Sequence, residues 1–317
     1  MRPRPTALAH ALILAVVTVT PGARAQTAIK IVVPAPAGGA GDIVARVLTE
    51  QVGRAQAQTI VVENRPGAGT IIGTEAVARA APDGATLLIT APYLVIAPHM
   101  RKVNFDLLTS FEPICHLVSS PGVIVVNSAS PYRTLADFVT AARAKPGELT
   151  FAAAGPGTVQ QIGFEMLKRA ADVNITFVPY PGGAPAITAL LGGHVTAVFA
   201  EYAPLAEHIK AGRLRAIATT TRARIDPLPD VATVAESYQD YEVDFWWGLF
   251  APAKTPKQAV SQAADWFTTA MRMPEINAKL VTQGFVPVGT CGADFGVVLR
   301  QQYERYGRVI REANIKE

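Results

Sequence analysis

The stretch from Ile29 to Leu48 reads IKIVVPAPAGGAGDIVARVL and carries the pattern that decides the fold. Its first five residues are rich in β-branched side chains and end at Pro34, which is typical of a short buried strand. A glycine-rich turn over residues 36–41 follows. Asp42 then opens a segment with apolar residues at helical spacing. Strand, glycine turn and helix in this order predict the first unit of a parallel α/β sheet.

The same alternation continues along the chain. Strands are expected over residues 29–33, 59–62, 86–90, 122–127, 149–153, 175–179, 195–199 and 216–220. Helices are expected from residue 42 and over residues 72–81, 135–144, 159–171, 184–191, 259–271, 274–283 and 293–314. A length of 317 residues fits about two domains. Because no low-complexity linker marks a single boundary, we expect two α/β lobes with more than one crossing between them.

The N-terminus has the features of a secretory signal peptide. Arg2 and Arg4 precede an apolar run over residues 11–19, and residues 23–25 form an A-x-A cleavage site. The alternative, a membrane anchor, needs an apolar run of roughly 20 residues, which this segment lacks. Cleavage after Ala25 removes three arginines and lowers the net charge from +4 to about +1. We therefore expect export, to a bacterial periplasm.

Composition and missing motifs exclude several function classes. Hydrophobic residues make up 50% and charged residues 17%, so the chain can form a core and is not disordered. No basic patch remains after the leader, so nucleic acid is not an expected partner. The sequence has no phosphate-binding P-loop and no G-x-S-x-G hydrolase motif. Residues 67–73 (GAGTIIG) depart from the dinucleotide fingerprint in spacing and in distance from the preceding strand.

Histidines and cysteines do not predict a metal or a cofactor. Four histidines follow the leader: His99, His116, His194 and His208. No two of them have metal-ligand spacing. Cys115 lies in an apolar segment, and Cys291 is expected in a loop before the last helix. Export permits a disulfide between them, but two unpaired thiols fit the sequence equally well.

Three glycine-rich turns are the strongest candidates for a binding site. They span residues 34–42, 152–161 and 180–185, each between a predicted strand and a predicted helix, and contain no Lys or Arg. Helix N-termini offer free N–H groups and a positive dipole end, so the turns predict an anion site built from amides and hydroxyls. The alternative for any single turn is purely structural, because glycine-rich turns between a strand and a helix also occur where they only reverse the chain. Asp42 and Thr158 each fit a helix cap as well as a ligand contact.

Six stretches together resemble the substrate-binding proteins of the tripartite tricarboxylate transporter family, also called Bug-type receptors. These stretches are IVVPAPAGG (31–39) with Asp42, VVENRPGAG (61–69), ARAAPDG (78–84), PYPGGAPA (179–186), LPDV (228–231) with AE (235–236), and WWGLFAP (246–252). The resemblance covers essentially the whole chain after the leader.

The resemblance implies an α/β protein with the type II periplasmic-binding-protein fold, in which two lobes are joined by crossing strands around a ligand cleft. It divides the chain into a leader (1–25), lobe 1 (26–120 plus 245–317) and lobe 2 (121–244). It also implies a small organic carboxylate as ligand, no cofactor, no catalytic residue, membrane permease subunits as partners, and a monomer.

The resemblance and the three turns together predict the ligand-binding residues. They are Ala35, Gly38, Gly39, Asp42, Ala154, Gly157, Thr158, Gln161, Tyr180, Gly182, Gly183 and Glu201. The chain departs from the family where Ala154 replaces a hydroxyl residue and Gln161 a histidine. Two family aspartates are replaced by Thr196 and Ala200, and Glu201 is a candidate for a nearby charge. The acid bound cannot therefore be copied from a relative.

Two other functions remain open from the sequence. One is a receptor that signals to a sensor partner instead of serving a permease. The other is an exported enzyme that uses Asp42 or Glu201 on the same scaffold. It ranks lower because no nucleophile–base pair is visible.

Overall fold

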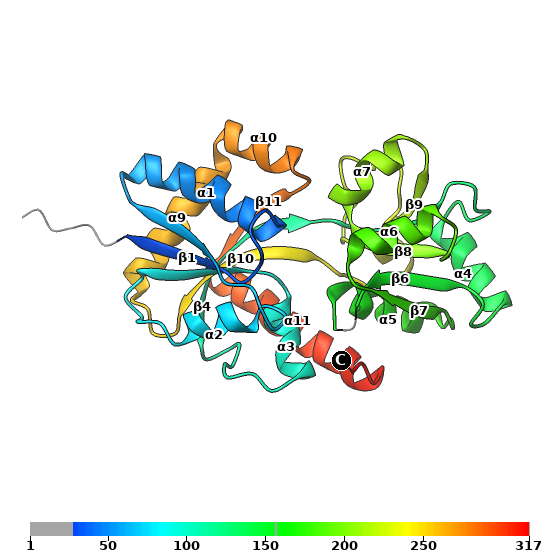
Figure 1. Cartoon of the computed structure of the whole chain (residues 1–317), viewed down its shortest axis with the longest axis horizontal. Helices are drawn as coiled ribbons and strands as arrows, with labels where there is room; N and C mark the ends of the chain where they lie inside the picture. The colour runs from blue at the N-terminus through cyan, green and yellow to red at the C-terminus, as the bar shows by residue number, and fades with distance from the viewer. Residues whose placement is uncertain (1–27, 156, 317) are drawn as a thin grey trace, which may run out of the picture.

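The computed structural model describes residues 28–155 and 157–316. The predicted signal peptide and its cleavage after Ala25 lie outside the described residues. The chain forms two α/β lobes side by side, each around its own sheet (Figure 1). The expected fold class is thereby confirmed. The strands of the first lobe come from before the first crossing and after the second, and those of the second lobe come from the one segment between the crossings.

The sheet of the first lobe has six strands in the order β11-β4-β10-β3-β1-β2. These strands are β1 (Ile29–Val33), β2 (Ile60–Asn64), β3 (Thr86–Thr90), β4 (Phe111–Ser120), β10 (Phe245–Pro252) and β11 (Val286–Cys291). β1 to β3 are parallel, and β10 runs antiparallel between β3 and β4. Alternate residues of β1 serve the two faces, since Ile31 and Val33 belong to one apolar cluster and Val32 to another.

Helices cover both faces of this sheet. They are α1 (Ala40–Gln56), α2 (Ile71–Ala78), α3 (Tyr93–Met100), α9 (Lys257–Arg272), α10 (Pro274–Thr282) and α11 (Gly292–Glu312). α1, α9 and α10 pack together on one face, and α2, α3 and α11 lie on the other.

The sheet of the second lobe has five strands in the order β7-β6-β8-β5-β9. They are β5 (Gly122–Asn127), β6 (Thr150–Ala154), β7 (Thr176–Tyr180), β8 (Ala197–Glu201) and β9 (Leu214–Thr219). β6, β7 and β8 are parallel, so their carboxyl ends share one edge of the sheet. The helices of this part of the chain are α4 (Leu135–Ala144), α5 (Val159–Ala171), α6 (Gly183–Leu191), α7 (Tyr202–Lys210) and α8 (Val234–Ser237).

The chain crosses between the two sheets at two adjacent points. β4 ends at Ser120, which pairs with Phe245 at the start of β10. Beyond this pair the backbone bonds belong to the second lobe, because Thr220 donates to the carbonyl of Gly122 and accepts from the N–H of Val243. Both crossings therefore leave the first sheet at the carboxyl end of β4.

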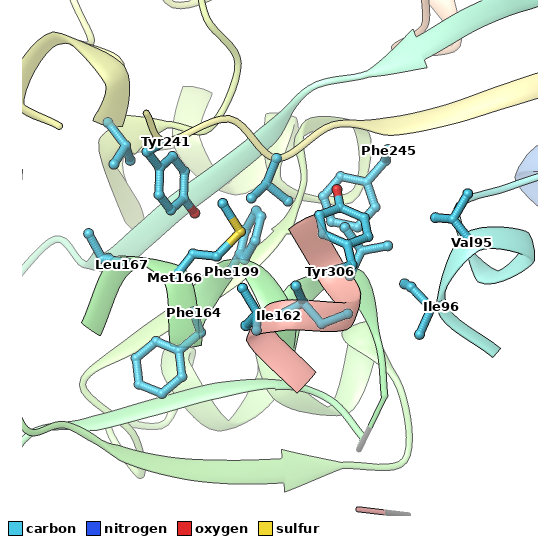
Figure 2. Close-up of a cluster of buried hydrophobic side chains, with 14 of the residues drawn as sticks. Val95, Ile96, Ile162, Phe164, Met166, Leu167, Phe199, Tyr241, Phe245 and Tyr306 are labelled. Carbon is cyan, nitrogen blue, oxygen red and sulfur yellow. The ribbon is translucent and has the colours of Figure 1, made fainter. Parts of the chain in front are cut away.

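One apolar cluster continues across both lobes on the side of α11. Figure 2 shows Val95 and Ile96 of α3 and Tyr306 of α11 next to Ile162 of α5 and Phe245 of β10. α11 contacts α3, β4 and α5, so it packs against elements of both lobes. This continuous core fixes one side of the junction between them.

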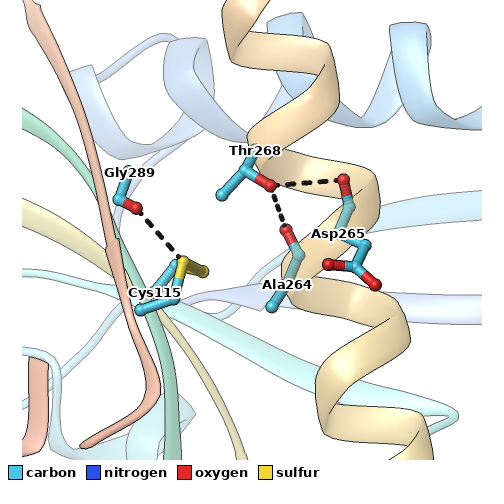
Figure 3. Close-up of a disulfide and its surroundings, with 6 residues drawn as sticks. Cys115, Ala264, Asp265, Thr268 and Gly289 are labelled. Atoms are coloured by element: carbon cyan, nitrogen blue, oxygen red, sulfur yellow. Dashed lines mark hydrogen bonds between the residues drawn. A yellow bond between two sulfur atoms is a disulfide. The ribbon is translucent and has the colours of Figure 1, made fainter. Parts of the chain in front are cut away.

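Cys115 and Cys291 form a disulfide. The two residues are directly opposite each other in the pairing of β4 with β11, and Figure 3 shows the bridge with α9 alongside. The structure thus selects one of the two alternatives that the sequence left open. It also corrects the expectation that Cys291 lies in a loop, since Cys291 ends β11. Pro287 and Gly289 hide this edge strand from a pattern-based prediction.

The predicted bounds of α4 and α5 are confirmed residue for residue. The sequence did not predict α3, α7, α8, β4, β10 or β11 as elements. α1 begins at Ala40 instead of at Asp42, with Gly39 as its N-cap.

Candidate functional site

The carboxyl ends of parallel strands in both lobes point to the junction between them. Ala154, Tyr180 and Glu201 end β6, β7 and β8 on one edge of the second sheet, and Ala154 is directly opposite Tyr180. In open α/β sheets this edge is where ligands bind. The structure therefore brings three of the predicted site residues to one edge.

A cavity of about 70 Å³ lies between the lobes. The first lobe contributes the connection from β3 to α3 and the start of β10, and the second lobe contributes the start of α5 and the end of β8. The lining residues are Ala91, Pro92, Tyr93, Val159, Gln160, Glu201, Phe245, Trp246 and Trp247. A cavity of this size holds several waters or a group of a few heavy atoms.

Glu201 is the one acidic or basic residue among those that line the cavity. Burial raises the pKa of its carboxyl, and the Ser120 side chain opposes that rise only in part. Tyr93 faces the same charge, since burial and then Glu201 raise the pKa of its hydroxyl. Gln160 adds a second acceptor, because its Oε1 is buried and has no hydrogen-bond partner among the described residues.

The first glycine turn is held by its own network of polar groups. Asp42 accepts hydrogen bonds from the N–H of Gly38 and from Nε of Arg46, both at 2.9 Å. Burial would raise the pKa of Asp42, but the bonds from Arg46 and Gly38 outweigh it and lower the pKa. Asn64 links Arg46 to the carbonyl of Ala35. The cation that pairs with Asp42 is therefore Arg46 of α1. The turn itself contains no Lys or Arg, so the sequence alone did not identify this cation.

This first turn backs onto the cavity wall. A side chain at Gly41 would overlap the ring of Trp247, which lines the cavity. Gly38 and Gly39 lie further out, and Gly38 has a positive φ of 80°. Glycine is thus required at position 41 for close packing on Trp247.

The second turn uses its polar groups to bind itself. Thr158 is the N-cap of α5: its hydroxyl accepts from the N–H of Gln161 and lies 2.9 Å from the carbonyl oxygen of Ala154, to which it donates. Oε1 of Gln161 accepts from the N–H of Gly157 at 2.8 Å. A Cβ added at Gly157 would lie 3.2 Å from Cε of Met100 in α3, so the turn faces the first lobe.

The third turn lies next to the second. A Cβ at Gly155 would point to the carbonyl oxygen of Tyr180, 3.7 Å away. Gly182 has a φ of 151°, and a Cβ at Gly183 would meet nothing within 4 Å. The open space at Gly183, the first residue of α6, leaves the N-terminus of this helix accessible.

Sequence reasoning missed a buried polar group at the crossing. Ser119 donates to Oδ2 of Asp244 at 2.6 Å, and His116 lies 3.0 Å from the same hydroxyl. Burial raises the pKa of Asp244 to about 7 and lowers the pKa of His116 to about 4. Tyr93 and Gln160 were also missed, although Tyr93 follows the carboxyl end of a predicted strand, which was the available signal.

A larger cavity of about 280 Å³ lies elsewhere in the first lobe. Ile29, Ile60 and Ala85 place it at the amino ends of β1 to β3, beside Trp266 of α9. This edge is opposite to the one where α/β sheets bind ligands. The smaller cavity between the lobes is therefore the better candidate.

Over residues 28–155 and 157–316, no group of three or more His, Cys, Asp or Glu side chains is arranged to hold a metal ion. Within the same residues, no helix has the length and apolar character needed to cross a membrane.

Two α/β lobes, two crossings and a cavity between the lobes define a solute-binding protein of the type II periplasmic class. The chain belongs to the tripartite tricarboxylate transporter receptor family (TctC), whose model matches residues 44–315. It is 34% identical over 284 residues to a UPF0065 protein of a Pseudomonas species, covering 89% of this chain and 84% of the relative. This is a family of receptors, so the chain is a receptor and not an enzyme.

Solved structures agree with this assignment. The periplasmic binding protein BugD has a TM-score of 0.74 at 31% identity, with 91% of this chain and 98% of BugD covered. A protein of R. palustris solved with adipate has a TM-score of 0.77 at 28% identity, covering 92% and 98%. MatC of Rhodopseudomonas palustris, solved with malate, has a TM-score of 0.72 at 26% identity, covering 89% and 98%.

Proposed function

We propose that this protein is an exported receptor that captures a small organic carboxylate between its lobes and delivers it to a membrane permease. The observation that carries the proposal is the cavity lined by both lobes at the carboxyl ends of their strands. Membership in the receptor family supports it, as do the relatives solved with adipate and malate.

The lobes in this proposal are residues 26–120 with 245–317, and residues 121–244. Sheet membership supports these limits, because every strand of the six-stranded sheet falls in the first set and every strand of the five-stranded sheet in the second. The pairing of Ser120 with Phe245 gives closure a short double hinge.

The proposed site consists of the three glycine turns and the cavity between them. Its residues are Ala35, Gly38, Gly39, Asp42, Ala154, Gly157, Thr158, Gln161, Tyr180, Gly182, Gly183 and Glu201. We assign Asp42, Thr158 and Gln161 to shaping the turns, since their polar atoms bond to the turns' own backbone. The amides at the start of α6, near Gly183, are suited to a ligand carboxylate.

A ligand screen tests this function. Ligand at 100 times its Kd should raise the free energy of unfolding by about 2.7 kcal/mol. It should also change tryptophan fluorescence, because Trp246 and Trp247 line the cavity. A Trp266→Phe variant removes the one other tryptophan of the chain and isolates this signal. If no member of a broad panel of organic acids changes either signal, the receptor proposal fails.

A further inference from the structure

The wall of the cavity between the lobes offers hydrogen-bond acceptors and aromatic faces. Glu201 contributes a carboxylate, and Gln160 contributes a buried oxygen that has no partner among the described residues. Tyr93, Phe245 and Trp247 supply rings. None of the lining residues is Lys, Arg or His. A site for carboxylates alone would not be expected to have this composition.

The side chains around the cavity do not satisfy these acceptors. Ser120 lowers the pKa of Glu201, but its hydroxyl has no hydrogen-bond partner among the described residues, so most lone pairs of the carboxylate are free. A ligand carboxylate in the cavity would be repelled by the ionised form of Glu201, and the oxygen of Gln160 would remain unsatisfied, which costs free energy. A ligand cation reverses both effects and also gains from the aromatic faces.

We propose that the ligand carries a cationic nitrogen in addition to its carboxylate, and that Glu201 and Gln160 bind this nitrogen in the cavity. This inference rests on the proposed function, because the carboxylate end is still bound at the glycine turns. An ammonium group has three donors. Two of them match Glu201 and Gln160, and its size fits a cavity of about 70 Å³.

Binding of the cation also favours the ionised form of Glu201. Burial favours the protonated carboxyl in the empty cavity, and a cation at contact distance favours the charged form. Among the described residues, Tyr93 and Asp244 are the titratable groups whose pKa Glu201 raises, and neither supplies a positive charge. Binding should therefore lower the pKa of Glu201.

Matched pairs of compounds that differ only in an amino group test the inference. Calorimetry would compare glutamate with glutarate, aspartate with succinate, and 4-aminobutyrate with butyrate. We expect at least one amino compound to bind ten times or more tighter than its partner. Its affinity should fall as the pH is lowered, because protonation of Glu201 removes the charge that binds the cation.

Two variants then assign the preference to the cavity. Glu201→Gln keeps the shape but removes the charge, and should reduce the preference for the amino compound at least tenfold. Gln160→Met removes the unpartnered oxygen and should reduce it less, which keeps the test valid if Glu201→Gln fails to fold. Glu207→Gln is the control, since it removes an exposed carboxylate of α7 from the same lobe and should leave the preference unchanged.

The possible failures are distinguishable. If the desamino acids bind as tightly as the amino compounds, or Glu201→Gln and Gln160→Met both keep the full preference, the cation inference is wrong while the receptor function stands. If neither member of any pair binds and the wider acid panel also fails, the proposed function itself is wrong.

Discussion

At the scale of single residues, the second glycine turn shows that a polar side chain near a site can serve the backbone instead of a ligand. Thr158 is 7% exposed. Its hydroxyl donates one hydrogen bond and accepts another, both within the turn. Gln161 occupies the N–H of Gly157, which would otherwise be available to an anion. The hydroxyl of Thr158 and the amide oxygen of Gln161 therefore maintain the shape of the turn, because both are already hydrogen-bonded within it.

Thr158→Val should destabilise the ligand-free protein by about 1–2 kcal/mol, because it removes an N-cap. Affinity should change less than tenfold, since the hydroxyl is engaged within the turn. Denaturant unfolding and calorimetric Kd on the same variant measure both quantities. Thr158→Ser keeps the hydroxyl and is the control. Normal stability combined with a loss of affinity beyond tenfold would return Thr158 to direct ligand contact.

At the scale of elements, β11 is an edge strand held in an unusual way. It pairs with β4 through Val286 and Pro287 and again through Thr290 and Cys291, with an irregularity between them. The disulfide to Cys115 lies at the second of these points. The bridge adds a covalent link to the second paired stretch, beyond the irregularity, and so fixes the strand that leads into α11.

Removal of the disulfide by Cys115→Ala with Cys291→Ala should lower the free energy of unfolding by about 2–5 kcal/mol. The bridge joins residues 176 positions apart, so it restricts the unfolded chain strongly. Denaturant unfolding measures the loss, and each single substitution should cost nearly as much as the pair. Equal midpoints for the oxidised and the reduced natural protein would contradict this expectation.

At the scale of the whole molecule, the two chain crossings lie next to a buried acid, Asp244, and a buried histidine, His116. Asp244 keeps its proton in the folded protein up to about pH 7, whereas an unfolded aspartate loses it near pH 4. Its contribution to stability therefore falls as pH rises between these values. His116, with a folded pKa of about 4, contributes in the opposite direction between about pH 4 and 6.5.

Asp244→Asn should remove the part of the unfolding free energy that falls as pH rises from about 4 to 7. Relative to the natural protein, the variant should gain about 1.4 kcal/mol of stability for each pH unit between pH 4 and 7. His116→Gln should show the reverse trend, losing stability relative to the natural protein from about pH 4 to 6.5. Unfolding curves at pH 4.5, 5.5, 6.5 and 7.5 measure these differences. A difference between Asp244→Asn and the natural protein that stays constant with pH would disprove the assignment.

The sequence by itself determined the α/β class and the two lobes, and it placed Glu201 two residues after a predicted strand. These features follow from local patterns. The helical spacing that sets α4 and α5, and the turn that starts α5, depend on neighbouring residues only. The irregular edge strand β11 lacks such a pattern, and the sequence did not predict it.

Only the tertiary structure decided which distant groups meet. Ser119 and Asp244 are 125 positions apart, and Cys115 and Cys291 are 176 apart, so no local pattern relates them. Tyr93 and Gln160 reach the same cavity from different lobes. The bonding of Thr158 and Gln161 to their own turn also needed atomic positions, because a cap and a ligand contact use the same side-chain chemistry. Local spacing fixed the elements, and packing between the lobes fixed the site.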